Sequence, residues 1–483
     1  MNKFYITTAI DYVNAEPHIG HAYQKVMADI LARWNNSFGK DTFFLTGTDE
    51  HGQKLADVAK ENKITPKELA DKNSLKFKKA WEFLNIKPNR FIRTTDKDHV
   101  KTVQEITKKI YEKGDICKGF YEGLYCKGCE AYLTEKELVG GKCPYHNKEP
   151  ELLKEDAYFF RLSKYQDRIL KHIKENPKFI LPLTRRNEIV NRIKEGLNDL
   201  SITRLNSNLT WGIPFPIDDK FTTYVWWDAL INYLSGIDYP NKKFSKYWPA
   251  DVHLLGKDNG WFHAVIWPAI LMSADIKLPK TVFIHGFLTF NKQKISKSLG
   301  NSIDPVQLGK KYGVDSIRYF LVREIPFYDD GNFSEESLKN RVNNELANEL
   351  GNLISRTLTL SKKLPEIKKS SVEIKFEVKN IEKLMDDYKL TEALNEIWRY
   401  VQETNKYINQ KEPWKLEGKE LDKVLYSCLE SIRKTSILLW PFIPETSEKI
   451  FSLLNIEKQN LKELNKEIKS YKVKKPEILF KKI

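Results

Sequence analysis

The hydrophobic pattern of this chain of 483 residues changes near residue 336. Before that point it alternates between strand-like and helix-like segments, and after it the pattern is helical only. Before it, short runs of β-branched and aromatic residues, such as Lys3–Thr8 and Asp41–Thr46, predict buried strands. The segment His18–Trp34 carries apolar residues at spacings of three and four, which predicts a helix after the first strand. Strands that alternate with helices predict an α/β domain built on a doubly wound parallel sheet.

After residue 336 the pattern is helical throughout. Apolar residues recur at spacings of three and four in the stretches Leu338–Leu364, Val378–Gln410 and Leu421–Trp440. These stretches predict an all-helical C-terminal bundle. One further helix is predicted just before it, over Val306–Leu321, where Asp304 and Pro305 suit an N-cap and a first helical position.

The motif His18-Ile19-Gly20-His21 stands at the start of the first predicted helix. A helix N-terminus carries unpaired N–H groups and a partial positive charge, which suit a phosphate group. Gly20 lets a ligand approach the backbone, and imidazoles can donate hydrogen bonds to charge that develops on an α-phosphate. The alternative is a capped surface helix with two ordinary histidines.

A second motif, Lys294-Ile295-Ser296-Lys297-Ser298, follows the segment Phe283–Phe290, which is predicted as a strand that runs into a loop. A mobile basic loop can close over a triphosphate and stabilise charge once the transition state forms. The alternative is a solvated loop in a lysine-rich protein.

Taken together and in this order, the two motifs resemble those of the class I aminoacyl-tRNA synthetases, and within them the methionyl-tRNA synthetases, over essentially the whole chain. Four further segments carry the same resemblance: Thr46–Gly52, Tyr224–Tyr233, Gly256–Asp258 and Trp261–Pro268. It implies that methionine and ATP form methionyl-adenylate and pyrophosphate, after which the 3′-terminal hydroxyl of tRNA(Met), initiator or elongator, attacks the adenylate. Catalysis would consist of positioning and charge stabilisation, because the methionine carboxylate is already ionised.

The resemblance also implies the site residues. The catalytic residues, which handle the phosphates with Mg²⁺, would be His18, His21, Lys294 and Lys297. The ATP site would further include Gly20, Ser296, Gly256 and Asp258, the last two at the adenosine. The methionine site would consist of Ile10, Tyr12, Asp49, Trp226, Ala229, Tyr233, Phe262, His263 and Trp267. Aromatic rings suit a polarizable thioether, although each ring taken singly is as easily a core residue.

The bundle would read the tRNA anticodon through Asn352, Arg356, Pro413 and Trp414. Asn352 and Arg356, four residues apart, share one helix face. Some relatives continue into a further tRNA-binding module that dimerises them, and this chain ends at Ile483 without it, so we expect a monomer. The sequence departs from the family pattern at Ala9 and Asp11, where close relatives often carry proline and an aromatic residue, and Asp11 lies close to the expected methionine site.

Two pairs of metal-ligand type stand at Cys126-x2-Cys129 and Cys143-x2-His146. Four protein ligands on two such turns predict one closed, structural zinc site per chain. Reduced thiols or a disulfide are the alternatives, and a disulfide is unusual in a cytosolic protein.

These signals divide the chain into five segments. They are the first half of the Rossmann-like catalytic domain (1–113), an insertion with the zinc ligands (114–223), the second half of the catalytic domain (224–272), the lysine-loop and stem-contact region (273–335) and the helical anticodon-binding domain (336–483). We expect the parallel sheet to resume near Tyr224.

Composition agrees with a nucleic-acid partner. The formal net charge is +15 and the isoelectric point is about 9.2, which favours a polyanion, although general lysine richness gives the same excess. No run of about 18 apolar residues and no secretory signal is present, so we expect a cytoplasmic protein without a membrane span. Two rival functions remain open: a smaller nucleotidylyltransferase, and an inactive paralogue that acts as an RNA-binding or regulatory protein.

Overall fold

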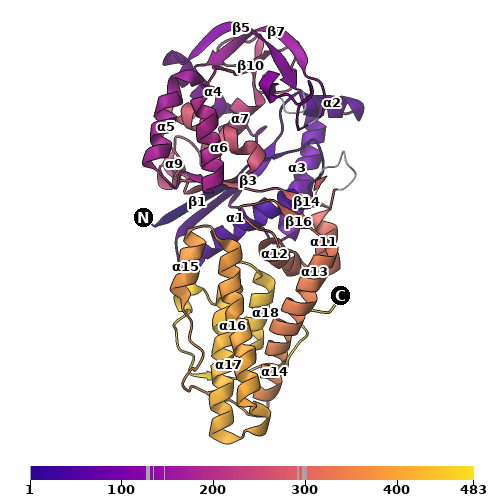
Figure 1. Cartoon of the computed structure of the whole chain (residues 1–483), viewed down its shortest axis with the longest axis vertical. Coiled ribbons are helices and arrows are strands. Elements are labelled where there is room, and N and C mark those ends of the chain that lie inside the picture. Colours follow the sequence, from indigo (N-terminus) through magenta and orange to yellow (C-terminus); the bar gives the residue numbers. More distant parts are fainter. Residues whose placement is uncertain (1, 127–130, 134, 146, 291–292, 296–301) are drawn as a thin grey trace.

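The computed structural model describes residues 2–126, 131–133, 135–145, 147–290, 293–295 and 302–483. Figure 1 shows an elongated molecule in which an α/β half carries a small β-rich layer at one end and a bundle of long helices at the other. None of the helices formed by these residues is long and apolar enough to cross a membrane.

The main sheet lies at the centre of the α/β half. Among the described residues it has seven strands, in the order β2-β3-β1-β12-β13-β8, with β4 also paired to β3. Every pairing is parallel, which confirms the predicted sheet. The strands are β1 (Lys3–Thr8), β2 (Asp11–Tyr12), β3 (Asp41–Asp49), β4 (Arg90–Arg93), β8 (Ile180–Leu181), β12 (Val252–Gly256) and β13 (Val282–His285).

Helices cover both faces of this sheet. Those of the α/β half are α1 (Ile19–Ser37), α2 (Gln53–Glu61), α3 (Pro66–Phe83), α4 (Lys97–Glu112), α7 (Val225–Leu230), α8 (Asn232–Ser235), α9 (Lys242–Tyr247) and α10 (Trp267–Ser273), the last preceded by a π-helical turn over Phe262–Ile266. Helix α1 is buried along almost its whole length, including Lys25, Asp29 and Arg33. Such burial is unusual for charged side chains and requires partners for each of them.

The insertion is an antiparallel sheet with two helices. Its strands lie in the order β6-β5-β7-β9, and its elements are β5 (Ile116–Cys126), β6 (Ala131–Leu133), β7 (Glu151–Phe160), α5 (Gln166–Glu175), α6 (Leu183–Lys194) and β9 (Leu200–Ser201). Strand β8, between the two helices, leaves this layer and pairs with β13, so the insertion also completes the edge of the main sheet.

The expectation that the main sheet resumes near Tyr224 is wrong. Strand β11 (Phe221–Thr223) pairs with β10 (Thr203–Leu205) in a separate hairpin, and α7 begins directly after Tyr224. The sheet resumes only at β12. A short apolar run does not distinguish a buried strand from a buried helix, and here the helix prevails.

The segment Phe283–Phe290, predicted as a strand that runs into a loop, contains parts of two strands. Strand β13 ends at His285, and β14 (Leu288–Phe290) belongs to a small sheet with β15 (Gln293–Lys294) and β16 (Gly331–Phe333). Gly286 lies at the division, where a Cβ atom would come within 2.2 Å of the Asp329 backbone. The close approach of two backbones requires glycine at this point and turns the chain out of the main sheet.

The helical predictions are largely confirmed. Asp304 caps α11 (Pro305–Tyr312) by accepting a hydrogen bond from Val306 N at 2.7 Å, and Gly313, at φ +87°, separates α11 from α12 (Val314–Arg323). The bundle consists of α13 (Glu335–Arg341), a π-helical stretch (Val342–Gly351), α14 (Asn352–Ser361), α15 (Val378–Asp386), α16 (Leu390–Lys411), α17 (Gly418–Leu439) and α18 (Pro444–Leu453), with a small β17–β18 pair (Ile367–Lys368, Ser470–Tyr471). The stretch expected as one helix from Val378 breaks at Tyr388, which adopts φ +59°.

A buried arginine joins the two halves. Arg318, on α12, donates to Asp29 Oδ2 of α1 at 2.6 Å and to the carbonyl of Phe442, which follows α17, at 3.0 Å. Its side chain is fully buried, and one continuous hydrophobic cluster runs from α1 into the bundle. The catalytic half and the bundle therefore share a core.

Candidate active site

The two sequence motifs meet at the N-terminus of α1. Ile19 N, the first helical amide, donates a hydrogen bond of 2.9 Å to the carbonyl of Ile303, just beyond the lysine loop. Ile295, inside that loop, is 4% exposed and packs in the same hydrophobic cluster as Ile19. Lys294 lies in β15, whereas Ser296 and Lys297 lie outside the described residues. The C-terminal end of the loop is thus anchored at the predicted phosphate-binding helix terminus, and Ile295 is anchored in the core that α1 also joins.

His18 and His21 form a capping box of imidazoles. His18 Nδ1 accepts from Gly20 N and His21 Nδ1 accepts from His18 N, both at 3.1 Å, and the two rings stack with centroids 3.7 Å apart. Backbone amides can only donate, so neither Nδ1 atom carries a proton, and each neutral ring carries its proton on Nε2. The helix terminus therefore fixes both histidines as Nε2–H donors.

Burial keeps His21 uncharged. Its pKa lies well below the ordinary value, first because the ring is desolvated and then because His18 and Lys25 are close. A neutral, oriented donor can stabilise charge that develops on a phosphate without binding the ground state as tightly as a cation would.

Two glycines of the predicted ATP site make room for neighbouring side chains. A Cβ atom on Gly20 would lie 3.0 Å from the His18 ring, and one on Gly256 would lie 3.0 Å from Asp258 Oδ1. Gly20 therefore allows the His18 ring to fold over the helix terminus, in addition to its predicted role of admitting a ligand. Lys257, which lies between Gly256 and Asp258, pairs with Asp330 at 2.6 Å and so fixes this turn against the start of β16.

Aromatic side chains of the predicted methionine site gather beyond the carboxyl ends of the strands. Trp226 and Phe262 stack with centroids 3.7 Å apart at an angle of 8°, and both are partly buried. Tyr233 and His263 are buried and joined by a hydrogen bond of 2.6 Å. His263 Nδ1 lies 2.9 Å from the Asn259 carbonyl, so it carries the proton, and Nε2 accepts from the tyrosine hydroxyl. Burial lowers the pKa of His263 to about 4.

Trp267 and Ala229 lie deeper than the stacked pair. Trp267 is fully buried, and its Nε1–H donates to His253 Nε2 at 3.2 Å. His253 in turn bonds Thr7 of β1 at 2.6 Å. Trp267 thus belongs to the hydrophobic core and also touches Tyr233, with ring centroids 5.9 Å apart.

The remaining residues of the predicted methionine site come from the ends of β1 and β3. Ala9 N bonds the Leu254 carbonyl at 3.1 Å, and Tyr12 pairs in register with Asp49, the last residue of β3. Ile10 lies in the connection between these two pairings. The Tyr12 hydroxyl accepts from Leu55 N at 3.1 Å, at the start of α2. These strand ends are where ligands bind in open α/β sheets.

At the far end of the bundle, the four predicted anticodon residues lie on α14 and on the turn after α16. Arg356 donates to Asn409 at 2.8 Å, and its guanidinium carbon lies 5.8 Å from the centre of the Trp414 ring. Trp414 is 43% exposed, Pro413 is buried, and Asn352 begins α14.

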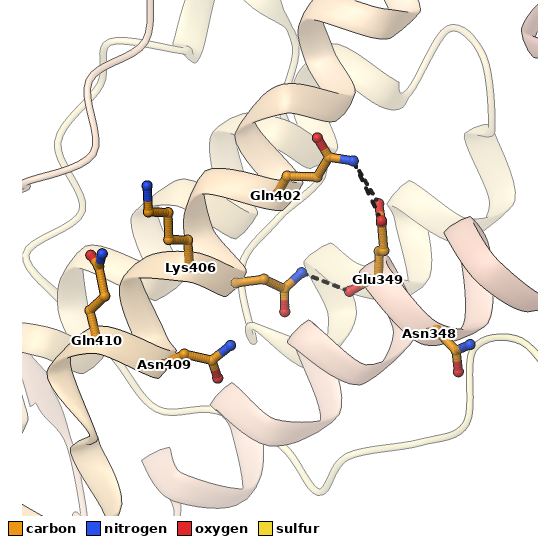
Figure 2. Close-up of a pocket in the computed structure, with 7 residues that line it drawn as sticks. Asn348, Glu349, Gln402, Lys406, Asn409 and Gln410 are labelled. Carbon is orange, nitrogen blue, oxygen red and sulfur yellow. Dashed lines mark hydrogen bonds between the residues drawn. The ribbon is translucent and has the colours of Figure 1, made fainter.

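A polar cavity of about 620 Å³ adjoins this group (Figure 2). Its lining residues are Asn348, Glu349, Gln402, Asn405, Lys406, Asn409 and Gln410, of which Asn409 also bonds Arg356. Asn405 donates to the Glu349 carbonyl at 3.1 Å, so α16 and the π-helical stretch form the two walls. The sequence analysis missed this cavity, although the amides at 402, 405 and 409 repeat at helical spacing.

Two family models match the chain. The model of tRNA synthetases class I (M) matches residues 4–150 and 145–358, and the model of the anticodon binding domain of methionyl tRNA ligase matches residues 362–483. The chain belongs to the class I methionyl-tRNA synthetases.

Relatives and solved structures match this chain over nearly its whole length. The methionine–tRNA ligase of Thermotoga maritima is 47% identical, with 100% of this chain and 80% of the relative covered, and that of Caldanaerobacter subterraneus is 48% identical, with 99% and 79% covered. The structure of Mycobacterium tuberculosis methionyl-tRNA synthetase in complex with methionyl-adenylate has a TM-score of 0.95 at 39% identity, covering 99% of this chain and 100% of that one.

This methionyl-tRNA synthetase has part of its predicted zinc ligand set in the described residues. Cys126, at the end of β5, is 3% exposed, and Cys143, after the Val139–Lys142 bridge, is 1% exposed. Cys129 and His146 lie outside the described residues. Among the residues that the structure describes, no group of three or more His, Cys, Asp or Glu side chains is placed to hold a metal ion.

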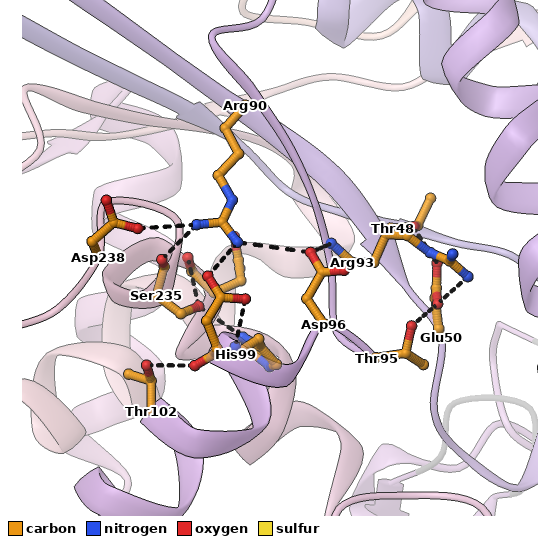
Figure 3. A network of polar contacts seen from close by, with 12 residues as sticks. Thr48, Glu50, Arg90, Arg93, Thr95, Asp96, His99, Thr102, Ser235 and Asp238 are labelled. Atoms are coloured by element: carbon orange, nitrogen blue, oxygen red, sulfur yellow. Dashed lines mark hydrogen bonds and ion pairs between the residues drawn. The ribbon is translucent and has the colours of Figure 1, made fainter.

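Polar contacts that sequence reasoning missed hold two residues that adjoin the predicted methionine site. Asp228, next to Ala229, accepts from His51 and from His99, each at 2.7 Å. Burial alone would raise the pKa of Asp228, but the interactions with these two histidines outweigh it and hold the pKa below its usual value. Glu50, next to Asp49, receives two bonds from Arg93, at 2.6 and 2.9 Å (Figure 3). No sequence signal joins these partners, because they lie far apart in the chain.

Proposed function

We propose that this chain attaches methionine to tRNA(Met) in two steps. The methionine carboxylate attacks the α-phosphate of ATP and pyrophosphate leaves, and the tRNA 3′-terminal hydroxyl then attacks the carbonyl carbon of the adenylate and AMP leaves. The observation that carries the proposal is the N-terminus of α1, where two imidazoles are held as Nε2–H donors and the first helical amide bonds Ile303, just beyond the lysine loop.

His18 and His21 donate hydrogen bonds to the α-phosphate as its charge develops. Lys294, Lys297 and Ser296 bind the departing phosphates together with the Mg²⁺ ion that accompanies ATP. Gly256 and Asp258 hold the adenosine. No side chain serves as nucleophile or base, because the attacking carboxylate is ionised and the site only has to align it.

Asp49 and the Ile10 backbone bind the methionine ammonium group. The thioether side chain lies among the aromatic residues, with Trp226 and Phe262 as the accessible wall and Trp267 as the floor. The Tyr233–His263 hydrogen bond supports this arrangement, because it holds both polar groups in fixed orientations. The remaining members are Tyr12 and Ala229.

Asn352, Arg356, Pro413 and Trp414 read the anticodon of initiator and elongator tRNA(Met). The exposed face of Trp414 offers a stacking surface to an unpaired base, and Arg356 and the adjoining amide-lined cavity offer hydrogen bonds. The net charge of +15 supports a polyanionic partner of this kind.

Cys126, Cys129, Cys143 and His146 hold one structural zinc ion. The burial of Cys126 and Cys143 and the thiol and imidazole donor set suit zinc, and four protein ligands leave no coordination position for chemistry. Elemental analysis of protein purified without chelator should find about one equivalent per chain. Less than about half an equivalent would count against the site.

ATP–pyrophosphate exchange with each of the twenty amino acids tests the activity. Methionine alone should support strong exchange. Exchange with a different amino acid would refute the specificity, and exchange with none would favour an inactive, RNA-binding paralogue. A nucleotidylyltransferase would act without any amino acid.

Two further predictions stay untested by the structure. Sedimentation equilibrium should give the mass of a monomer, and cell fractionation should place the protein in the cytoplasm.

A further inference from the structure

A fully buried lysine lies in the middle of the active-site half. Lys25, on α1, has no exposed surface and forms an ion pair with Asp11, which is 6% exposed. Its ammonium group also donates to the Ala9 carbonyl at 3.1 Å and to Gln24 Oε1 at 2.8 Å. Three acceptors match the three ammonium protons, so the cation is fully hydrogen-bonded.

These acceptors belong to the segment that leads into the methionine site. Ala9 and Asp11 flank Ile10, and Asp11 is followed by Tyr12 in β2. The segment is pinned before Ile10 by the bond from Ala9 N to Leu254 O and after it by the pairing of Tyr12 with Asp49. Lys25 is the contact that ties the stretch between these two pairings to α1.

The same lysine also faces the phosphate side of the site. Lys25 follows His21 by four residues, so both project from one face of α1. Gln24 Nε2, the other end of the amide that accepts from Lys25, lies 3.3 Å from His285 Nε2. The His285 ring lies 3.6 Å from the point where a Cβ of Gly256 would stand. A line of buried polar groups thus runs from Asp11 to the predicted adenosine turn.

Stability alone does not account for this pair. Desolvation of two charges offsets most of the Coulomb attraction, and well-packed apolar replacements of buried ion pairs are often neutral. Burial also raises the pKa of Asp11 to about 6 in spite of Lys25, and Asp11 Oδ2 has no hydrogen-bond partner among the residues that the structure describes. The geometry therefore favours a role in placing the neighbouring backbone.

We propose that Lys25 is a positioning residue for methionine activation, which with Asp11 fixes the backbone from Ala9 to Tyr12 relative to the histidine-bearing helix. The inference rests on the proposed function of that segment in binding methionine. The effect should fall mainly on methionine, because Lys25 hydrogen-bonds directly to the methionine segment. It reaches the ATP side through its bond to Gln24 and through its charge near His21.

Steady-state exchange with Lys25→Met, Asp11→Asn and the double variant tests this role. We expect KM for methionine to rise about tenfold or more, as displacement of a positioning group does, while KM for ATP stays within about twofold. Each single variant leaves one buried charge unpaired and should also lower the melting temperature. The double variant removes both charges, so it should melt near the wild type and still show the raised KM for methionine.

Lys3→Met is the matched control. Lys3 lies at the opposite end of β1 and has the same kind of partners, Asp251 at 2.9 Å and the Pro249 carbonyl, away from the methionine site. It should lose stability without a change in either KM. A double variant with wild-type stability and wild-type KM for methionine would overturn the role of Lys25, as would equal effects of Lys3→Met. Failure of the unaltered protein to exchange with methionine would instead refute the proposed function.

Discussion

The two functional ends of this molecule differ in how their polar groups are held. At the catalytic end, Tyr233 and His263 are buried, His21 is partly buried, and all three have defined hydrogen-bond partners. At the anticodon end, Trp414 is 43% exposed, and Arg356 reaches an open cavity lined by amides. Charge that develops during a reaction needs donors fixed in advance and shielded from water. An unstacked base can be bound by an accessible ring and adaptable amides.

The distribution of histidines along the sequence follows the same division between the two halves. All nine histidines lie at or before residue 285, so the helical bundle contains none. Three of those in the α/β half, His253, His263 and His285, are buried with lowered pKa values. The catalytic half therefore carries imidazoles whose protonation opposes folding, whereas the helical bundle has no imidazole to protonate. The comparison can be tested at each end separately.

Lys297→Ala should produce the largest effect, and only at the catalytic end. If Lys297 contacts phosphate charge mainly in the transition state, the rate of adenylate formation should fall by about 100- to 1,000-fold. Binding of ATP, methionine and tRNA should change far less. Pre-steady-state measurement of pyrophosphate release separates the rate from the binding constants.

Lys310→Ala, at an exposed position on α11, is a control for loss of one positive charge and should keep the wild-type rate. Weakened substrate binding with an unchanged rate constant would contradict the role given to Lys297.

His285→Gln should have an effect of intermediate size among these predictions. It should reduce the amount of folding stability that the protein loses in acid. Burial lowers the pKa of His285 to about 4. Between about pH 6.5 and pH 4 this imidazole is therefore protonated in the unfolded chain and neutral in the folded chain. Stability is therefore lost as the pH falls from about 6.5 to about 4, by about 3 kcal/mol for this one group. Removal of the imidazole should flatten that loss, although it costs hydrogen bonds to Gln24 and Gly286 at neutral pH.

Chemical denaturation at pH 7 and pH 5 measures this slope. Hydrogen exchange should locate the acid effect in β13 and α1, while α16 and α17 of the histidine-free bundle keep their protection. An identical slope for the wild type and His285→Gln would mean that His285 is not neutral in the folded state.

The sequence predicted correctly those elements that depend mainly on residues close together in the chain, such as a buried strand or a helix cap. Strand β1 was predicted with its observed bounds, Lys3–Thr8, because a run of β-branched and aromatic residues fits a buried parallel strand. Asp304 was predicted as an N-cap from its place before Pro305. The helix break at Tyr388 was missed because apolar spacing continues across it.

Contacts between distant residues could not be predicted in this way. The motifs located the helix terminus and the loop, but nothing in them indicated that the histidines would cap α1 with their own rings, since histidine is an uncommon cap. Lys25 reads as an ordinary polar helix position until Asp11 is seen beside it. The partners of Asp228 come from two other segments of the chain. Tertiary packing decides all three.

Trp414→Ala should give the smallest effect, confined to the anticodon end. If its exposed face stacks on an anticodon base, loss of the ring should weaken aminoacylation of tRNA(Met) by about 1–3 kcal/mol, or about 5- to 150-fold in kcat/KM. Methionine-dependent exchange without tRNA should stay near the wild-type rate, because the proposed active site lies in the other half of the molecule. The melting temperature should also hold, since a residue that is 43% exposed contributes little packing.

Trp398 in the same bundle supplies the contrast. It is 1% exposed and donates to Glu349 at 2.5 Å, so Trp398→Ala should cost about 3–5 kcal/mol of stability, as truncation of a core aromatic residue does. The two tryptophans differ mainly in exposure, so their variants separate recognition from packing within one domain. If Trp414→Ala lowered the melting temperature as far as Trp398→Ala and left tRNA discrimination unchanged, Trp414 would be a packing residue, and the anticodon end would lose its proposed stacking surface. Lost aminoacylation with intact melting and exchange would instead establish that an exposed ring serves recognition where the catalytic half relies on buried ones.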